Sequence, residues 1–118
     1  MQVVTRTFTP DEFSKAVMGY FTGAQKIIND YFANSILQPH KLSMTKGRRY
    51  VKLISERPSS IPGKSGGRSV FAFIDTASGD ILKPESWSRP AMHARGNIFD
   101  ADFGLSRTRW TGPEYLNS

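Results

Sequence analysis

The feature that most restricts the possible folds of this chain is a basic loop with a short strand-like segment on each side. The first segment covers residues 48–54, the second residues 69–74, and residues 57–68 between them are mostly Arg, Lys, Pro, Gly and Ser. Both segments are rich in β-branched and aromatic residues, and Gly and Pro punctuate the loop. We therefore predict two antiparallel strands joined by a flexible loop.

Alternation along these strands predicts which side chains share a face, because successive side chains point to opposite sides. One side is aliphatic: Val51, Leu53, Val70, Ala72 and Ile74. If it packs inward, the outward side is aromatic and basic: Tyr50, Phe71, Phe73, Arg48 and Lys52. This surface would be a stacking platform with cations around it, although a one-residue slip in register would exchange the two faces.

The N-terminal third predicts a long amphipathic helix over residues 9–34. Thr9 and Glu12 form a capping box with Pro10 in the first turn, and apolar residues recur at steps of three and four to about Ala33. Gly19 and Gly23 cost such a helix about 1 kcal/mol each relative to Ala. Close packing against another backbone, in this chain or a second subunit, and a bend are both open explanations.

The rest of the chain completes a single α+β domain of residues 1–118. Residues 41–45 alternate weakly and predict a hairpin with the first strand, and residues 81–83 predict a short strand that Pro84 ends. Residues 90–95 can make one or two helical turns. We expect the helix to pack on an antiparallel sheet of three or four strands within residues 41–83, followed by an irregular segment, 84–118, with a short helix and a tail.

The positive charge is concentrated in the middle of the chain. Residues 41–68 hold eight Lys and Arg against the single acid Glu56, whereas the flanking parts are close to neutral and the whole chain carries +6. A general solubility effect would spread this charge evenly. The concentration favours a polyanionic partner, with nucleic acid ahead of a membrane because no amphipathic basic helix accompanies the charge.

Several classes of site are absent from the sequence. The chain has no cysteine, its two histidines lie far apart, and no His-x-x-x-His pair suggests metal ligands. Gly63-Lys64-Ser65 resembles part of a phosphate-binding loop, but no glycine stands five residues earlier and the flanks predict strands. Asp75 and Asp80 are candidate ligands for the metal of a nuclease, but they flank a turn, where Asp is common, and we favour the turn role. We expect no enzymatic activity, metal or cofactor, and no membrane span.

The C-terminal third carries a recognisable motif. Lys83-Pro84-Glu85-Ser86-Trp87 is followed by Pro90-Ala91-Met92-His93-Ala94-Arg95-Gly96-Asn97-Ile98. This pattern resembles one found in many small phage-encoded proteins, and the match runs from about Tyr50 to Ile98 with a looser ending at residues 112–116. In size, charge and order of elements the chain is also similar to the single-stranded-DNA-binding transcription regulators of podoviruses, the Drc type. The resemblance implies a single-stranded DNA ligand, an oligomer and the cytoplasm of an infected bacterium.

Together these features predict a largely sequence-tolerant binder of single-stranded DNA that acts in phage transcription or replication, with RNA as an alternative ligand. The candidate binding residues are Lys46, Arg48, Arg49, Tyr50, Lys52, Arg57, Lys64, Arg68, Phe71, Phe73, Trp87 and Arg95. Trp87, His93 and Arg95 have structural roles as open alternatives. We expect a homo-oligomer, a dimer or higher. The competing hypothesis is a phage interaction protein that binds a host enzyme such as RNA polymerase through the same aromatic surface.

Overall fold

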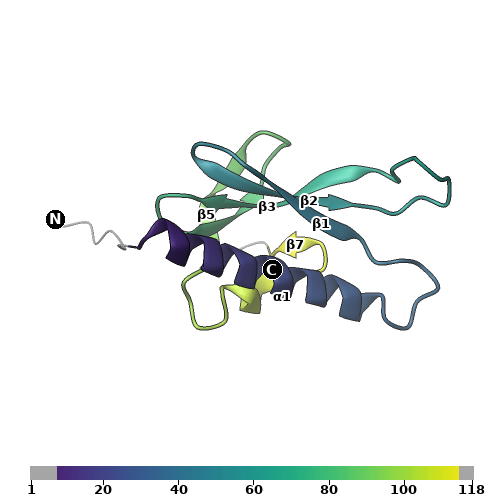
Figure 1. The fold of residues 1–118 in the computed structure, drawn as a ribbon, viewed down its shortest axis with the longest axis horizontal. Helices are drawn as coiled ribbons and strands as arrows, with labels where there is room; N and C mark the ends of the chain where they lie inside the picture. The colour runs from purple at the N-terminus through teal and green to yellow at the C-terminus, as the bar shows by residue number, and fades with distance from the viewer. Residues whose placement is uncertain (1–7, 115–118) are drawn as a thin grey trace.

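In the computed structural model, which describes residues 8–114, helix α1 (Pro10–Tyr31) lies along one face of a twisted antiparallel sheet (Figure 1). The predicted capping box is present: the Glu12 amide donates to Thr9 Oγ1 at 3.1 Å, and the Thr9 amide donates to Glu12 Oε1 at 2.9 Å. These bonds satisfy amides that have no partner within the helix. The buried stripe of α1 then follows the predicted periodicity from Phe13 to Ile28.

The sheet has five strands, in the order β1-β2-β3-β4-β5, so each strand pairs with its neighbour in sequence. Their bounds are Lys41–Lys46 (β1), Tyr50–Glu56 (β2), Arg68–Asp75 (β3), Asp80–Pro84 (β4) and Pro90–Asn97 (β5). The α+β class is confirmed, but the expected three or four strands are wrong by at least one. Strands β1 and β5 form the two edges.

The additional strand is β5, where we predicted helical turns over residues 90–95. Pro90 stands at the first position of an edge strand, where its missing amide costs no ladder hydrogen bond. Pairing with β4, which places Leu82 opposite Ala94, provides partners that an isolated helical turn would lack. The structure has a short helix later in the chain, the 3₁₀ turn η1 (Leu105–Arg107).

After η1 the chain forms a small hairpin, β6 (Thr108–Arg109) and β7 (Gly112–Pro113), near the centre of α1 (Figure 1). Tyr20 of α1 is fully buried there, and its hydroxyl lies 2.9 Å from the hydroxyl oxygen of Thr108. Burial raises the pKa of Tyr20 far above its usual range. The C-terminal segment therefore belongs to the core, and only residues 115–118 of the predicted tail lie outside the described residues.

The two helix glycines receive this C-terminal segment. A Cβ on Gly19 would lie 2.5 Å from the Phe103 ring, and a Cβ on Gly23 would collide with the Leu105 side chain. Both glycines are therefore sites of close packing, but their neighbours are side chains of the same chain and not the other backbone that was one of the two explanations. Phe103 itself has a φ of 57°, an uncommon value for a bulky residue.

Candidate nucleic-acid interface

The pairing of β2 with β3 decides which rings reach the face away from α1. Lys52 pairs with Phe73 and Leu53 with Ala72, but Ile54 pairs with Val70, so an extra residue, Phe71, is inserted in β3. Such a bulge interrupts the alternation of faces. Phe71 is only 1% exposed and joins the core against α1 together with Ala72. Its predicted outward position is wrong, whereas Val51, Leu53 and Ile74 pack inward as predicted.

The face away from α1 contains a hollow of about 550 Å³, which we call the basic hollow. It is lined by Thr45, Lys46, Gly47, Arg48, Arg49, Tyr50, Lys52, Ile54, Arg68, Phe73 and Trp87. Eight of the twelve candidate residues are thus brought together, and no acidic side chain is among the lining residues. Thr45 was missed because only its pairing with Lys52 places it there.

Lys52 links the rings of the basic hollow. Its Nζ lies 4.7 Å from the ring centroid of Trp87 and 5.7 Å from that of Phe73. The rings of Tyr50 and Phe73 meet edge to face at 5.7 Å. Phe73 is 2% exposed and supports the floor, whereas Trp87 is 48% exposed and offers the accessible ring.

Arg48 and Arg49 occupy the turn between β1 and β2, where we predicted the beginning of a strand. The Gly47 amide donates to the Tyr50 carbonyl at 2.9 Å, and β2 begins only at Tyr50. Thr76 fixes this turn by donating from its hydroxyl to the carbonyls of Arg48 and Arg49. The Arg49 guanidinium then lies 5.4 Å from the Tyr50 ring centroid.

Trp87 reaches the basic hollow from the connection between β4 and β5. The amides of Glu85 and Ser86 both donate to the Arg89 carbonyl, at 2.9 and 3.0 Å, which folds this connection into a tight loop. This loop places the indole ring of Trp87 against the Lys52 ammonium group and leaves the Trp87 side chain about half exposed. Trp87 is therefore a surface residue on the predicted face, in place of the alternative core position.

Arg68 closes another side of the basic hollow and is partly neutralised. Its Nε lies 3.6 Å from Glu56 Oε1, and both side chains are about half exposed. An exposed pair of this kind contributes little to stability. The positive potential of the basic hollow therefore comes mainly from Lys46, Arg48, Arg49 and Lys52.

Arg57 and Lys64 lie outside the basic hollow, on the loop between β2 and β3. The base of this loop is closed: the Arg57 amide donates to the Gly67 carbonyl at 2.8 Å, and the Gly66 amide donates to the Arg57 carbonyl at 2.9 Å. These bonds extend the hairpin beyond its strands. The structure therefore gives definite geometry to the base of a loop whose composition suggested flexibility throughout.

Arg95 also lies elsewhere and has a structural role. Its Nε donates to the Glu114 carbonyl at 3.1 Å, and its Nη1 donates to the His93 carbonyl. Lys83 donates in the same way to the Pro113 carbonyl at 3.0 Å. Burial, and secondly the nearby Arg95 charge, lower the pKa of Lys83. Both bases thus join the sheet to the end of the C-terminal hairpin.

The remainder of the motif also builds the fold. Asn97 Nδ2 donates to the Ser78 carbonyl at 2.9 Å and to Asp80 Oδ1 at 3.0 Å. Gly96 lies beside Gly104, where an added Cβ would be 3.0 Å from the Gly104 carbonyl oxygen. Of this motif, only Trp87 contributes to the basic hollow. The last two residues of its looser ending, Tyr115 and Leu116, lie outside the described residues.

Within residues 8–114, no three His, Asp or Glu side chains gather where they could hold a metal ion. Among the described residues no helix combines the length and the apolar character needed to span a membrane.

Comparison with known proteins identifies a family but no individual protein. No curated protein matches the chain, and no solved structure does. A family match covers residues 12–116, which includes all but the first two residues of α1, the whole sheet and the C-terminal hairpin. The chain therefore belongs to a protein family of unknown function, DUF7717.

Proposed function

We propose that this protein is a non-enzymatic binder of single-stranded nucleic acid, with DNA as the preferred ligand. The main support for this proposal is that cations and aromatic rings together line the basic hollow, on the sheet face that α1 does not cover. Nucleic acid presents both complementary groups, because its phosphates are anionic and its bases are flat and apolar. A partner with charge alone would leave the exposed Trp87 ring unused.

The arrangement favours single strands over duplex. A base can stack on an indole only when it has left its own stack, and each such contact contributes about 1–3 kcal/mol. Trp87 is the accessible ring, with Lys52 near the indole and Tyr50 lining the same hollow. Lys46, Arg48 and Arg49 at the tip of the β1–β2 hairpin would neutralise phosphates and release counterions. No base-reading side chains are required, so binding is sequence-tolerant.

The biological setting is part of the same proposal. The resemblance of the Lys83–Ile98 motif to phage-encoded proteins supports a role in phage transcription or replication, in the cytoplasm of the infected host. Similarity to the podovirus regulators supports a homo-oligomer. Sedimentation velocity with and without DNA tests this point, and a monomer in both conditions contradicts it.

The test is a titration of a fluorescently labelled single-stranded oligonucleotide at two salt concentrations, with a duplex of the same length in parallel. We expect tighter binding to the single strand and a steep loss of affinity as salt increases. Equal affinity for both forms would contradict stacking. Absence of salt-sensitive binding would favour the alternative of an interaction protein directed at a host enzyme.

A further inference from the structure

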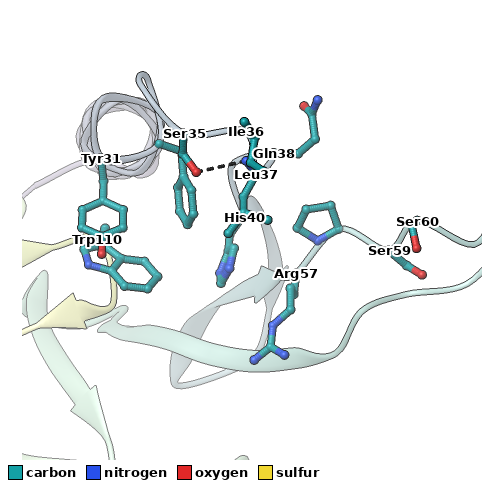
Figure 2. Close-up of a pocket in the computed structure, with 12 residues that line it drawn as sticks. Tyr31, Ser35, Ile36, Leu37, Gln38, His40, Arg57, Ser59, Ser60 and Trp110 are labelled. Atoms are coloured by element: carbon teal, nitrogen blue, oxygen red, sulfur yellow. Dashed lines mark hydrogen bonds between the residues drawn. The ribbon is translucent and has the colours of Figure 1, made fainter.

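A second hollow, of about 800 Å³, lies on the helix side of the sheet (Figure 2). It is bounded by the end of α1, the connection to β1 and the first residues of the β2–β3 loop. Figure 2 shows Tyr31 and Trp110 at one end and Ser59 and Ser60 at the other, with His40 and Arg57 between them. We call this the ring pocket. Its volume falls within the usual range for small-molecule sites, about 300–1,000 Å³.

The rings of this pocket are held by one another. Tyr31 stacks on Trp110 with centroids 4.3 Å apart, and Phe32 and His40 present edges to the same indole at 5.4 and 5.6 Å. Phe32 also stacks on His40 at 5.3 Å. Tyr31 nevertheless remains 57% exposed. An aromatic surface is therefore ordered in advance and accessible, which lowers the entropy cost of binding.

The charge of the ring pocket restricts its ligand. Arg57 is the only Lys, Arg, Asp or Glu side chain among the lining residues, and it is exposed. Burial, and secondly the Arg57 charge, lower the pKa of His40, which favours the uncharged imidazole. Hydroxyl groups of Ser35, Ser59 and Ser60 add neutral hydrogen-bonding capacity. A cationic ligand is disfavoured here, and an anion attached to a flat apolar body is favoured.

We propose that the ring pocket binds a nucleobase that carries a phosphate, with the base against the Tyr31–Trp110 pair and the phosphate toward Arg57. The source is either a free mononucleotide or the phosphorylated end of a strand. This site lies across the sheet from the basic hollow and does not require that the latter bind DNA. Guanidinium groups suit phosphate because they donate two parallel hydrogen bonds.

The chain offers one reporter for each site, since its two tryptophans are Trp87 in the basic hollow and Trp110 in the ring pocket. We would titrate dAMP into ¹⁵N-labelled protein and follow both indole N–H signals. The expected result is a saturable shift of the Trp110 signal. The variant Trp87→Phe, with Trp110 as its sole tryptophan, should show saturable quenching of tryptophan fluorescence by the same ligand.

Charge variants test the phosphate contact. Arg57→Gln should weaken dAMP binding about tenfold, and unphosphorylated deoxyadenosine should bind the parent protein more weakly by a similar factor. Lys15→Gln is the matched control, because Lys15 is an exposed cation on α1 that lines neither hollow. The Lys15→Gln variant should bind dAMP with the affinity of the parent protein. An equal loss in both variants would overturn the proposal.

Oligonucleotides distinguish the source of the ligand and separate this proposal from the proposed function. A short oligonucleotide with a 5′-phosphate that shifts Trp110 more strongly than its unphosphorylated form identifies a strand end, whereas a response to dAMP alone identifies a free nucleotide. If neither ligand moves Trp110, the ring pocket is no nucleotide site and suits contact with another protein. A shift of Trp87 in that same experiment would still support the basic hollow.

Discussion

Lys52 is the residue at which the two interactions of the basic hollow meet. Its ammonium group lies over the Trp87 ring and beside Phe73, and it borders the arginines of the β1–β2 turn. A base stacked on Trp87 would bring its own phosphate close to this charge. The electrostatic and stacking contributions can therefore be separated by changing these two residues in turn.

Lys52→Gln should weaken oligonucleotide binding and reduce the slope of log affinity against log salt by about 0.7, the contribution of one phosphate contact to a single strand. Trp87→Ala should weaken binding about tenfold and leave that slope unchanged. Trp87→Phe, which keeps a flat ring, should lose less affinity than Trp87→Ala. Equal slopes in the Lys52 variant and the parent would contradict a phosphate contact.

Phe71 separates stability from binding. Because it is 1% exposed in the core, Phe71→Leu should lower the free energy of unfolding by about 1–3 kcal/mol. Oligonucleotide affinity should remain at the parent value, since Phe71 does not line the basic hollow. Denaturant unfolding and the fluorescence titration measure the two effects. A loss of affinity at temperatures where the variant is fully folded would show that Phe71 contributes to nucleic-acid binding.

Asp102 gives a pH dependence whose sign is fixed by its hydrogen bonds. The Gly104 amide donates to its carboxylate at 2.9 Å, as does the Ser106 amide, and the Gly104 bond is the main cause that lowers the pKa of Asp102. A group with a lowered folded-state pKa stabilises the fold above its unfolded pKa, and this contribution disappears as pH falls through the folded value. Asp102→Asn should therefore be less stable than the parent at pH 7, and the difference should shrink below about pH 4.

At the scale of elements, helix α1 and the C-terminal hairpin are joined by a buried polar pair. Tyr20→Phe leaves the buried Thr108 hydroxyl without its partner and should cost about 1–3 kcal/mol. Adding Thr108→Val to Tyr20→Phe removes the unpaired group, so the double variant should lose less stability than the two single losses combined. Additive losses in chemical denaturation would show that the two hydroxyls act independently.

The same scale shows which elements can be predicted from sequence. The start of α1 follows from Thr9 and Glu12, because a capping box acts through bonds within four residues. Strand β5 was missed because residues 90–95 satisfy a local helical pattern, and only pairing with the distant β4 selects the strand. The bulge at Phe71 was missed for a related reason, since an inserted residue is visible only when both strands are aligned.

Across the whole molecule, the clustering of charge in the sequence was a better guide to the candidate site than the alternation of side chains along the strands. Cations near one another in sequence, from Lys46 to Lys52, also meet in space because they flank one tight turn. The ring pocket could not be predicted in this way. Trp110 is distant in sequence from Tyr31 and His40, and it meets them only because the C-terminal hairpin returns to the end of α1.

Ligand binding to the folded state should be visible in the stability of the entire domain. A single-stranded oligonucleotide at 100 times its dissociation constant should raise the free energy of unfolding by about 2.7 kcal/mol. A thermal-shift measurement should therefore show a higher Tm with oligonucleotide, and added salt should diminish the increase. The same concentration of an uncharged polymer is the control, and an equal increase with that polymer would contradict specific association.

The closed base of the β2–β3 loop makes its tip a natural attachment point. Gly63 has a left-handed φ of 77°, and a Cβ built there meets no atom within 4 Å, while the Arg57 and Gly67 backbones hold the hairpin together below it. A few inserted residues or a tethered dye at this tip should leave strand register undisturbed. If the protein is immobilised through that tip, the basic hollow on the sheet face that α1 does not cover stays accessible to solution.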